Sequence, residues 1–196
     1  VGTPEACGNA ITYEYNDVDV CGNPLTYTQT ITIDPAPAPM VVNPPADLTI
    51  TCGDALPAFV DIEYNNDITG DCEISGTFNN GIQVGTPDPC GNAITYEYSG
   101  NDVCGNPLTY IQTITVDPAP APTFINAPTN LAIVCGDVLP NADPLEYSNN
   151  ISGDCEISGF IDGVLNGTPD PCGNVITIDY NGVDICGNPL TFIQSV

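Results

Sequence analysis

The 23 residues ITYEYSGNDVCGNPLTYIQTITV, from Ile94 to Val116, contain two runs in which bulky residues alternate with small or polar ones. Side chains of a β-strand point to opposite faces with a period of two, so Ile94–Tyr98 and Leu108–Val116 are predicted strands. The Gly, Asn and Pro residues of the segment between them, Asn101–Pro107, favour a turn. The whole stretch therefore predicts a β-hairpin.

This hairpin sequence occurs three times, because the chain repeats with a period of about 83 residues. The first copy contains only the hairpin cysteines Cys7 and Cys21, whereas four cysteines recur in order in the other two: Cys52, Cys72, Cys90 and Cys104, then Cys135, Cys155, Cys172 and Cys186. Repetition at a fixed period indicates a tandem array. We expect this sequence to be part of a longer polypeptide.

The predicted domain boundaries follow from this repeat. Residues 1–34 are the C-terminal half of a preceding repeat, and residues 45–117 and 128–196 are two further repeats, the last truncated in its final strand. The alternating Pro and Ala residues at 35–44 and 118–127 favour extended polyproline II, so both segments are predicted to be semi-rigid linkers. We expect an elongated rod.

Each repeat contains only strand patterns. Upstream of the hairpin these patterns are Asp47–Cys52, Phe59–Tyr64 and Glu73–Phe78, separated by clusters of Gly, Asn, Asp and Pro. Roughly seven short strands in about 75 residues are typical of an immunoglobulin-like sandwich. The predicted fold is all-β: tandem immunoglobulin-like β-sandwich repeats joined by Pro/Ala-rich linkers.

The composition excludes most catalytic chemistry. The chain has no Lys, Arg or His and 25 acidic residues, which gives a formal net charge of −25. Without His or Lys there is no base for a nucleophilic triad and no lysine for a phosphate-binding loop. The charge opposes binding to nucleic acid and anionic membranes. We expect no enzymatic activity, no membrane insertion and no obligatory cofactor.

The ten cysteines, in a chain without histidine, predict disulfides formed in an oxidising compartment. Cys90 and Cys104 flank one strand, which would separate their Cα atoms by some 30 Å, against the 4.4–6.8 Å that a disulfide tolerates. In an immunoglobulin-like sandwich the first strand ends near the start of the sixth, which predicts bonds within each repeat. The predicted pairs are Cys52–Cys90, Cys72–Cys104, Cys135–Cys172 and Cys155–Cys186, with Cys7 and Cys21 bonded to cysteines upstream of residue 1.

A calcium site is the one candidate for ligand chemistry. Calcium prefers clustered carboxylate and carbonyl oxygens. The predicted topology brings Asp67, Asp71 and Glu73 to the same end of a repeat as Asp102, facing Asp34 of the preceding repeat. The alternative is that these residues form turns and attract counterions only diffusely, and the sequence leaves both interpretations open.

The string GTPDPCGNAITYEY, followed by NDVCGNP and a Thr/Ile/Val strand ending in Asp-Pro, resembles the hyalin-repeat (HYR-like) modules of immunoglobulin type. Modules with this cysteine-containing turn are similar to the tandem repeats of giant cell-surface adhesins in gliding, type IX-secreting Bacteroidetes, the SprB type. The resemblance implies an extracellular structural stalk or filament for surface attachment or gliding motility, whose partners are neighbouring repeats. Polysaccharide or surface ligands would bind outside this sequence. The alternative is that the repeats themselves bind polysaccharide or a partner protein.

Overall fold

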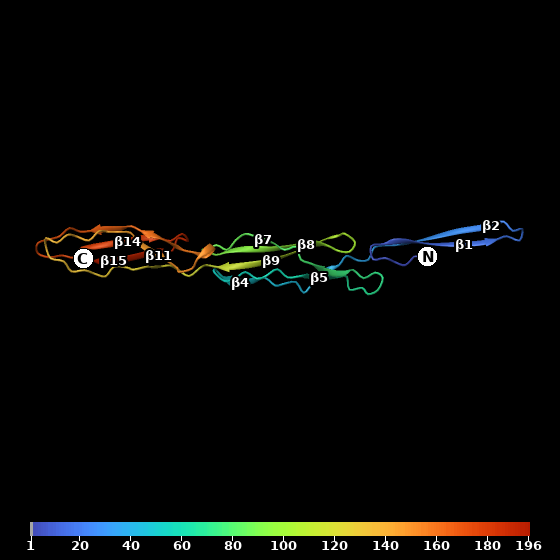
Figure 1. Cartoon of the computed structure of the whole chain (residues 1–196), viewed down its shortest axis with the longest axis horizontal. Coiled ribbons are helices and arrows are strands. Elements are labelled where there is room, and N and C mark those ends of the chain that lie inside the picture. The colour runs from blue at the N-terminus through green and yellow to red at the C-terminus, as the bar shows by residue number, and fades with distance from the viewer. Residues whose placement is uncertain (1) are drawn as a thin grey trace. The chain divides into compact units, whose positions relative to one another are not determined.

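The computed structural model describes residues 2–196, and its regular elements are β-strands apart from one short 3-10 turn (Figure 1). No α-helix occurs in this range, so the predicted all-β class is confirmed. The elements are β1 (Asn9–Val18), β2 (Pro24–Ile33), β3 (Met40–Val42), β4 (Leu48–Thr51), β5 (Ile62–Asn65), β6 (Ser75–Phe78), β7 (Ile82–Val84), β8 (Asn92–Asn101), β9 (Pro107–Asp117), β10 (Thr123–Phe124), β11 (Leu145–Ser148), η1 (Gly153–Cys155), β12 (Ser158–Ile161), β13 (Gly163–Asn166), β14 (Thr177–Val183) and β15 (Pro189–Ser195).

The chain divides into two compact units that do not follow the predicted repeats. Unit 1 comprises Val1–Asp47, Pro57–Val84 and Thr95–Thr113, and unit 2 comprises Leu48–Leu56, Gly85–Ile94 and Ile114–Val196. Each unit thus combines segments from successive predicted repeats. The predicted domain boundaries stay a prediction.

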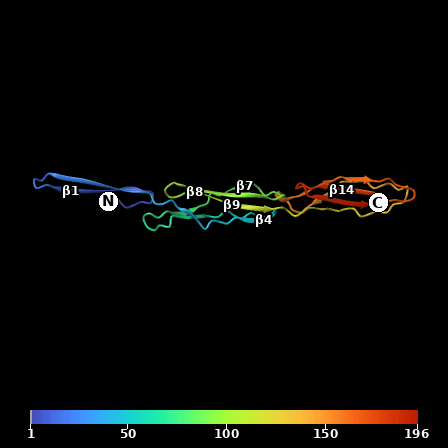
Figure 2. The ribbon, with the colours of Figure 1, turned by 180° about the vertical axis from the view of Figure 1, so that it is seen from behind.

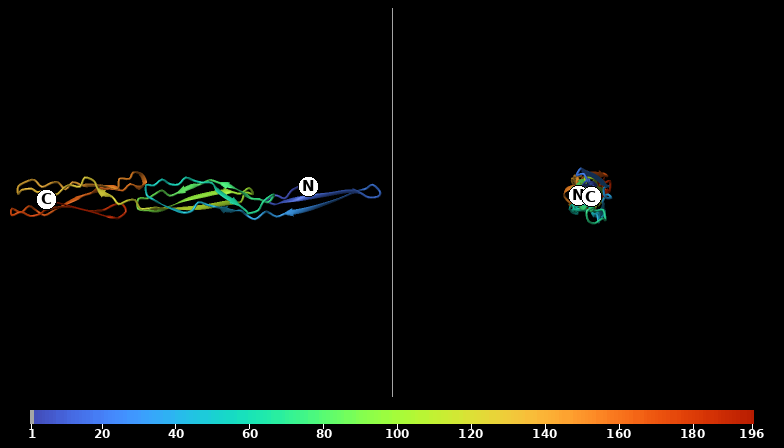
Figure 3. Two further views of the ribbon diagram at one scale, coloured as in Figure 1. Left: turned by 90° about the horizontal axis from the view of Figure 1, so that it is seen from below. Right: turned by 90° about the vertical axis from the view of Figure 1, so that its right-hand side faces the viewer.

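The hairpin of β1 and β2 pairs without interruption from Asn9 opposite Ile33 to Val18 opposite Pro24. It is drawn in blue in Figure 1 and is seen from another side in Figure 3. Strand β2 begins one residue before Leu25 and ends at Ile33, which correspond one repeat earlier to Leu108 and Val116, the ends of a predicted strand. Alternation of Thr with larger residues was therefore a sufficient signal for this strand.

Strands β3, β5 and β6 form an antiparallel sheet. Within it Tyr64 lies opposite Gly76, and a Cβ atom at Gly76 would lie only 2.7 Å from the Tyr64 Oη. A four-stranded sheet has the order β4-β9-β8-β7, with β4 parallel to β9 and Leu48 opposite Ile114 (Figure 2). Several sheets of this kind are compatible with a β-sandwich.

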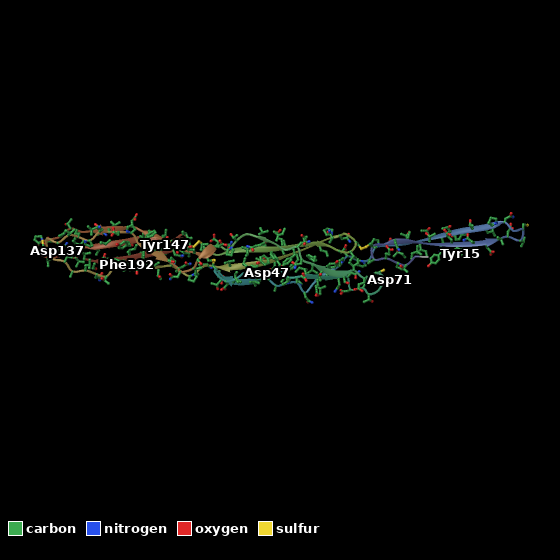
Figure 4. The ribbon with its side chains drawn as sticks, in the orientation of Figure 1. Tyr15, Asp47, Asp71, Asp137, Tyr147 and Phe192 are labelled. Carbon is green, nitrogen blue, oxygen red and sulfur yellow. A yellow bond between two sulfur atoms is a disulfide. The ribbon has the colours of Figure 1, made fainter. Side chains whose placement is uncertain are left out.

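The remaining strands form two antiparallel sheets in the orders β10-β11-β12 and β13-β14-β15. Tyr147, marked in Figure 4, lies opposite Gly159 in the same way as Tyr64 lies opposite Gly76. Phe192, also marked in Figure 4, packs with its ring centroid 6.0 Å from that of Tyr180.

Buried side chains occupy alternate positions along the strands. In β8 the side chains of Ile94, Tyr96 and Tyr98 are buried, while Thr95 and Glu97 between them are more exposed. This arrangement confirms the predicted period of two. In strands β8, β9 and β14 one face contributes side chains to the apolar core.

The predicted linkers are not free spacers. Their second parts contain β3 and β10, which pair with β5 and β11. Their first parts donate backbone hydrogen bonds, from Ala36 N to the Ala6 oxygen at 2.8 Å and from Ala119 N to the Pro89 oxygen at 2.9 Å. Gly91, at φ +84°, lies against Pro118, and a Cβ atom there would come within 3.0 Å of the proline ring. Both linkers are therefore fixed to the loop before the hairpin.

We expect Ile178→Ala to lower the free energy of unfolding by about 2–5 kcal/mol, because the side chain is fully buried and its loss leaves a cavity. The control is Ile193→Ala on the adjacent strand β15, where the side chain is 58% exposed. That change should stay within about 0.5 kcal/mol. Denaturant unfolding measures both, and equal effects would contradict the assigned faces of β14 and β15.

Candidate functional site at the cysteine junctions

Three disulfides join cysteines that lie 96 to 103 residues apart in the sequence. They are Cys7–Cys104, Cys52–Cys155 and Cys90–Cys186, with Cα–Cα distances of 5.2, 5.6 and 5.2 Å. Each disulfide lies inside one compact unit, the first in unit 1 and the other two in unit 2. In terms of the sequence repeat, all three connect one repeat to the next.

The predicted pairing within each repeat is therefore wrong. None of Cys52–Cys90, Cys72–Cys104, Cys135–Cys172 and Cys155–Cys186 forms, and Cys7 bonds downstream to Cys104 rather than upstream. The prediction treated each repeat as a closed sandwich. The predicted proximity was partly right, since Cys52 Sγ lies 3.3 Å from the carbonyl oxygen of Asp88, two residues before Cys90.

One element of the prediction holds. Cys90 and Cys104, at opposite ends of β8, do not bond to each other. The strand holds them apart, as its length requires. No feature of the cysteine spacing distinguished a bond within a repeat from a bond between repeats, because every repeat contains the same cysteines.

An aspartate in the hairpin turn holds the cysteine of that turn in position. Asp102 Oδ1 accepts hydrogen bonds from the backbone N–H groups of Cys104 and Asn106, at 2.9 and 2.8 Å, and its Oδ2 accepts one from Asn106 Nδ2 at 2.8 Å. Asp19 and Asp184 make the same three contacts in the other two hairpins. A buried carboxylate at Asp102 and Asp184 thus fixes the turn that holds the disulfide.

These hydrogen bonds lower the pKa of all three carboxyl groups. For Asp19 and Asp102 the largest cause is the bond from the side chain of Asn23 or Asn106. For Asp184 burial raises the pKa, and the hydrogen bonds from Asn188 and from backbone N–H groups outweigh it.

In the loop before β8, a different set of hydrogen bonds holds Cys90 in position. Asp88 Oδ1 accepts a hydrogen bond from Cys90 N at 2.8 Å, and Asn92 Nδ2 donates to the Thr86 oxygen at 2.8 Å. Gly91 closes the turn in a left-handed conformation that favours glycine. The CGN triplet is therefore a loop-closing element, and its conformation orients the cysteine.

Cys155 lies on a third kind of loop, which an asparagine closes. Asn149 Nδ2 donates to the Cys155 oxygen at 2.9 Å, and Asn149 Oδ1 accepts a hydrogen bond from Ile157 N at 3.1 Å. Cys155 and its partner Cys52 are both buried. This disulfide is therefore shielded from solvent.

The structure gives the predicted calcium set no supporting cluster. Both carboxylate oxygens of Asp102 accept hydrogen bonds within its own turn, and Glu73 Oε1 accepts one from Ser75 Oγ at 2.7 Å. Asp67 adopts a left-handed turn conformation, and Asp71 lies exposed on its loop (Figure 4).

Asp34, the fifth predicted ligand, is also exposed. Residues 2–196 contain no group of three or more His, Cys, Asp or Glu side chains placed to hold a metal ion. The hydrogen bonds agree with the alternative in which these residues form turns. Calcium binding stays a prediction.

No family model, no curated protein and no solved structure matches this chain. Among residues 2–196 no helix is long and apolar enough to cross a membrane. The functional argument therefore depends on the disulfides and on the residues that position them.

Peptide mapping under non-reducing conditions should recover Cys7 linked to Cys104, Cys52 to Cys155 and Cys90 to Cys186. The chain lacks Lys and Arg, so trypsin cannot cleave it, and the digestion uses a protease that cleaves after Asp and Glu. Acidic residues separate all ten cysteines, so that every link can be assigned. Recovery of Cys52 linked to Cys90 would restore the pairing within a repeat.

Acidification should weaken the hairpin turns. The folded pKa of Asp102 and Asp184 lies below the unfolded value of about 4, so their contribution to stability is complete above that pH and is lost as the pH falls through the folded value. Asp102→Asn combined with Asp184→Asn should lower the melting temperature at pH 6 and reduce the further loss as the pH falls below about 4.

The matched control is Asp162→Asn, which changes an exposed carboxylate outside the turns. It should leave both the melting temperature and its pH dependence near those of the wild type. An identical acid response in the wild type and the double variant would show that the two turns do not contribute to it.

Proposed function

We propose that this chain is part of a tandem immunoglobulin-like stalk in an extracellular surface adhesin that serves attachment or gliding motility. The observation that carries the proposal is that the disulfides connect successive sequence repeats. A disulfide between two cysteines of one sequence repeat would protect that repeat alone. Bonds from one repeat to the next resist extension along the whole array, which is what a load-bearing segment requires.

The bonds provide a short covalent path through the chain. A pulling force applied to the ends passes from Cys7 to Cys104, back along the chain to Cys90, and across to Cys186. That path contains roughly 30 residues, which span about 100 Å at ~3.3–3.6 Å each. Without disulfides the 196 residues would extend to about 650–700 Å. Most of the chain is thereby excluded from the load.

Disulfides also suit the composition. A chain without Lys, Arg or His forms no salt bridge between side chains, and its 25 carboxylates repel one another. Repeats this small gain only marginal stability from apolar burial. Closing loops of about 100 residues adds about 4–5 kcal/mol each in the chain-entropy model of disulfide stabilisation.

The disulfides indicate an oxidising, non-cytoplasmic environment, since such bonds are rare in reducing compartments. The HYR-like repeat sequence supports the bacterial cell surface as that environment. A structural stalk needs no ligand-binding site on the repeats themselves. No specific observation favours the alternative, in which the repeats bind polysaccharide or a partner protein directly.

Single-molecule stretching between the two termini should give a fully extended length of about 100 Å for the oxidised chain and about 650–700 Å after reduction. In Cys90→Ser combined with Cys186→Ser, the shortest remaining path contains roughly 90 residues. The oxidised double variant should therefore extend to about 300–330 Å.

The matched control is Cys52→Ser combined with Cys155→Ser, which also removes one disulfide but leaves the shortest path intact. Its length should equal that of the wild type. An oxidised wild-type chain that extends as far as the reduced one would overturn the proposal.

A further inference from the structure

Four cysteines have no disulfide partner among residues 2–196: Cys21, Cys72, Cys135 and Cys172. Their positions follow the sequence repeat. Each corresponds, one repeat away, to a cysteine that is bonded: Cys21 to Cys104, Cys72 to Cys155, Cys135 to Cys52 and Cys172 to Cys90.

The bonded cysteines fall into two classes by direction. Cysteines in the hairpin turn and in the asparagine-closed loop, such as Cys186 and Cys155, bond to an earlier repeat. Cysteines after the first strand and in the CGN loop, such as Cys52 and Cys90, bond to a later one. By this correspondence Cys135 and Cys172 are directed to a later repeat.

The loops that hold the unpaired cysteines already have the geometry of the bonded ones. Around Cys72, Asn66 Nδ2 donates to the Cys72 oxygen at 3.0 Å and Asn66 Oδ1 accepts from Ile74 N at 3.0 Å. These are the contacts that Asn149 makes around the bonded Cys155. The loop therefore needs no partner to adopt its bonding conformation.

The same holds for the two unpaired cysteines of the last repeat. Val134 N donates to Asp137 Oδ2 at 3.1 Å beside Cys135, as Thr51 N donates to Asp54 Oδ2 at 3.0 Å beside Cys52. Figure 4 marks Asp137. Asp170 Oδ1 accepts from Cys172 N at 2.7 Å, the counterpart of the contact made by Asp88.

Cys135 and Cys172 line one surface pocket of about 520 Å³. Leu131, Val134 and Ile176 add apolar lining. In the preceding repeat the part of the corresponding surface around Cys52 is covered, since Cys52 is only 2% exposed. A Cβ atom on the adjacent Gly53 would lie 3.6 Å from Ile151 of the next repeat.

We propose that Cys135 and Cys172 form a two-point covalent docking site for a further repeat of the same sequence. An isoleucine-containing loop like the one around Cys155 occupies the pocket and bonds to Cys135, while a hairpin turn like that of Cys186 bonds to Cys172. Cys72 and Cys21 are the reciprocal groups, which bond to repeats that come earlier. This inference depends on the junction chemistry and not on the adhesive role.

Each bond forms by oxidation of two thiols. The two sulfur atoms join, two protons and two electrons leave, and a disulfide oxidant such as oxidised glutathione accepts them and becomes two thiols. The existing junctions require the same oxidant. No further co-reactant is needed.

The test extends the full chain by one repeat. Val196 occupies the same position in its repeat as Ile114, so a copy of residues 115–196 placed after Val196 continues the sequence repeat. The extension raises the number of cysteines from ten to fourteen. After refolding in a glutathione redox buffer, alkylation should still detect four free thiols, the same number as in residues 1–196. Mapping should link Cys135 to the copied Cys155 and Cys172 to the copied Cys186.

In the control, serine replaces the copied Cys155 and Cys186, and six free thiols are expected because Cys135 and Cys172 lose their partners. Eight free thiols in the extended chain, or a bond between the copied cysteines themselves, would overturn the proposal. Residues 1–196 alone provide an independent measurement under oxidised glutathione. Each of Cys135 and Cys172 should bind glutathione, and a Cys135–Cys172 bond would refute the site.

Discussion

The disulfide between the CGN loop of one repeat and the hairpin turn of the next is the constraint on which the other features depend. It occurs twice, as Cys7–Cys104 and Cys90–Cys186, with the same Cα–Cα distance of 5.2 Å. A disulfide tolerates only a narrow range of Cα separations, so both loops must be held in place. In Cys90–Cys186 the aspartates of the two loops, Asp88 and Asp184, do this by accepting hydrogen bonds from the backbone N–H groups of the two cysteines.

This use of acidic residues is consistent with the composition of the chain. In many proteins a buried aspartate pairs with a basic side chain, which this chain does not have. Here the carboxylates at Asp19, Asp102 and Asp184 are stabilised by hydrogen bonds from Asn side chains and backbone N–H groups instead. Hydrogen bonding to the charged form favours it. The acidic character is therefore compatible with a defined fold at the turns.

Alternation of residue types predicted most of the strands, because it determines which side chains share a face. Strands β2, β4, β8 and β9 lie at the predicted positions, within one or two residues at most ends. The alternation could not predict β3 and β10, which are only three and two residues long and follow prolines. Their strand character comes from pairing with β5 and β11, and pairing is a tertiary property.

The sequence by itself determined the all-β class, the hairpins and the turn chemistry, since these depend on residues close together in the chain. The tertiary structure decided which equivalent side chains are buried and which cysteines bond to each other. Tyr15 and Tyr98 occupy the same position in identical ITYEY runs, yet Tyr15 is 53% exposed and Tyr98 only 1%. Likewise Cys90 has equivalent cysteines in every repeat, and only the three-dimensional arrangement selects Cys186. Local sequence determines the loop conformation that orients each cysteine. Which distant cysteine becomes its partner depends on contacts between segments about 100 residues apart in the chain.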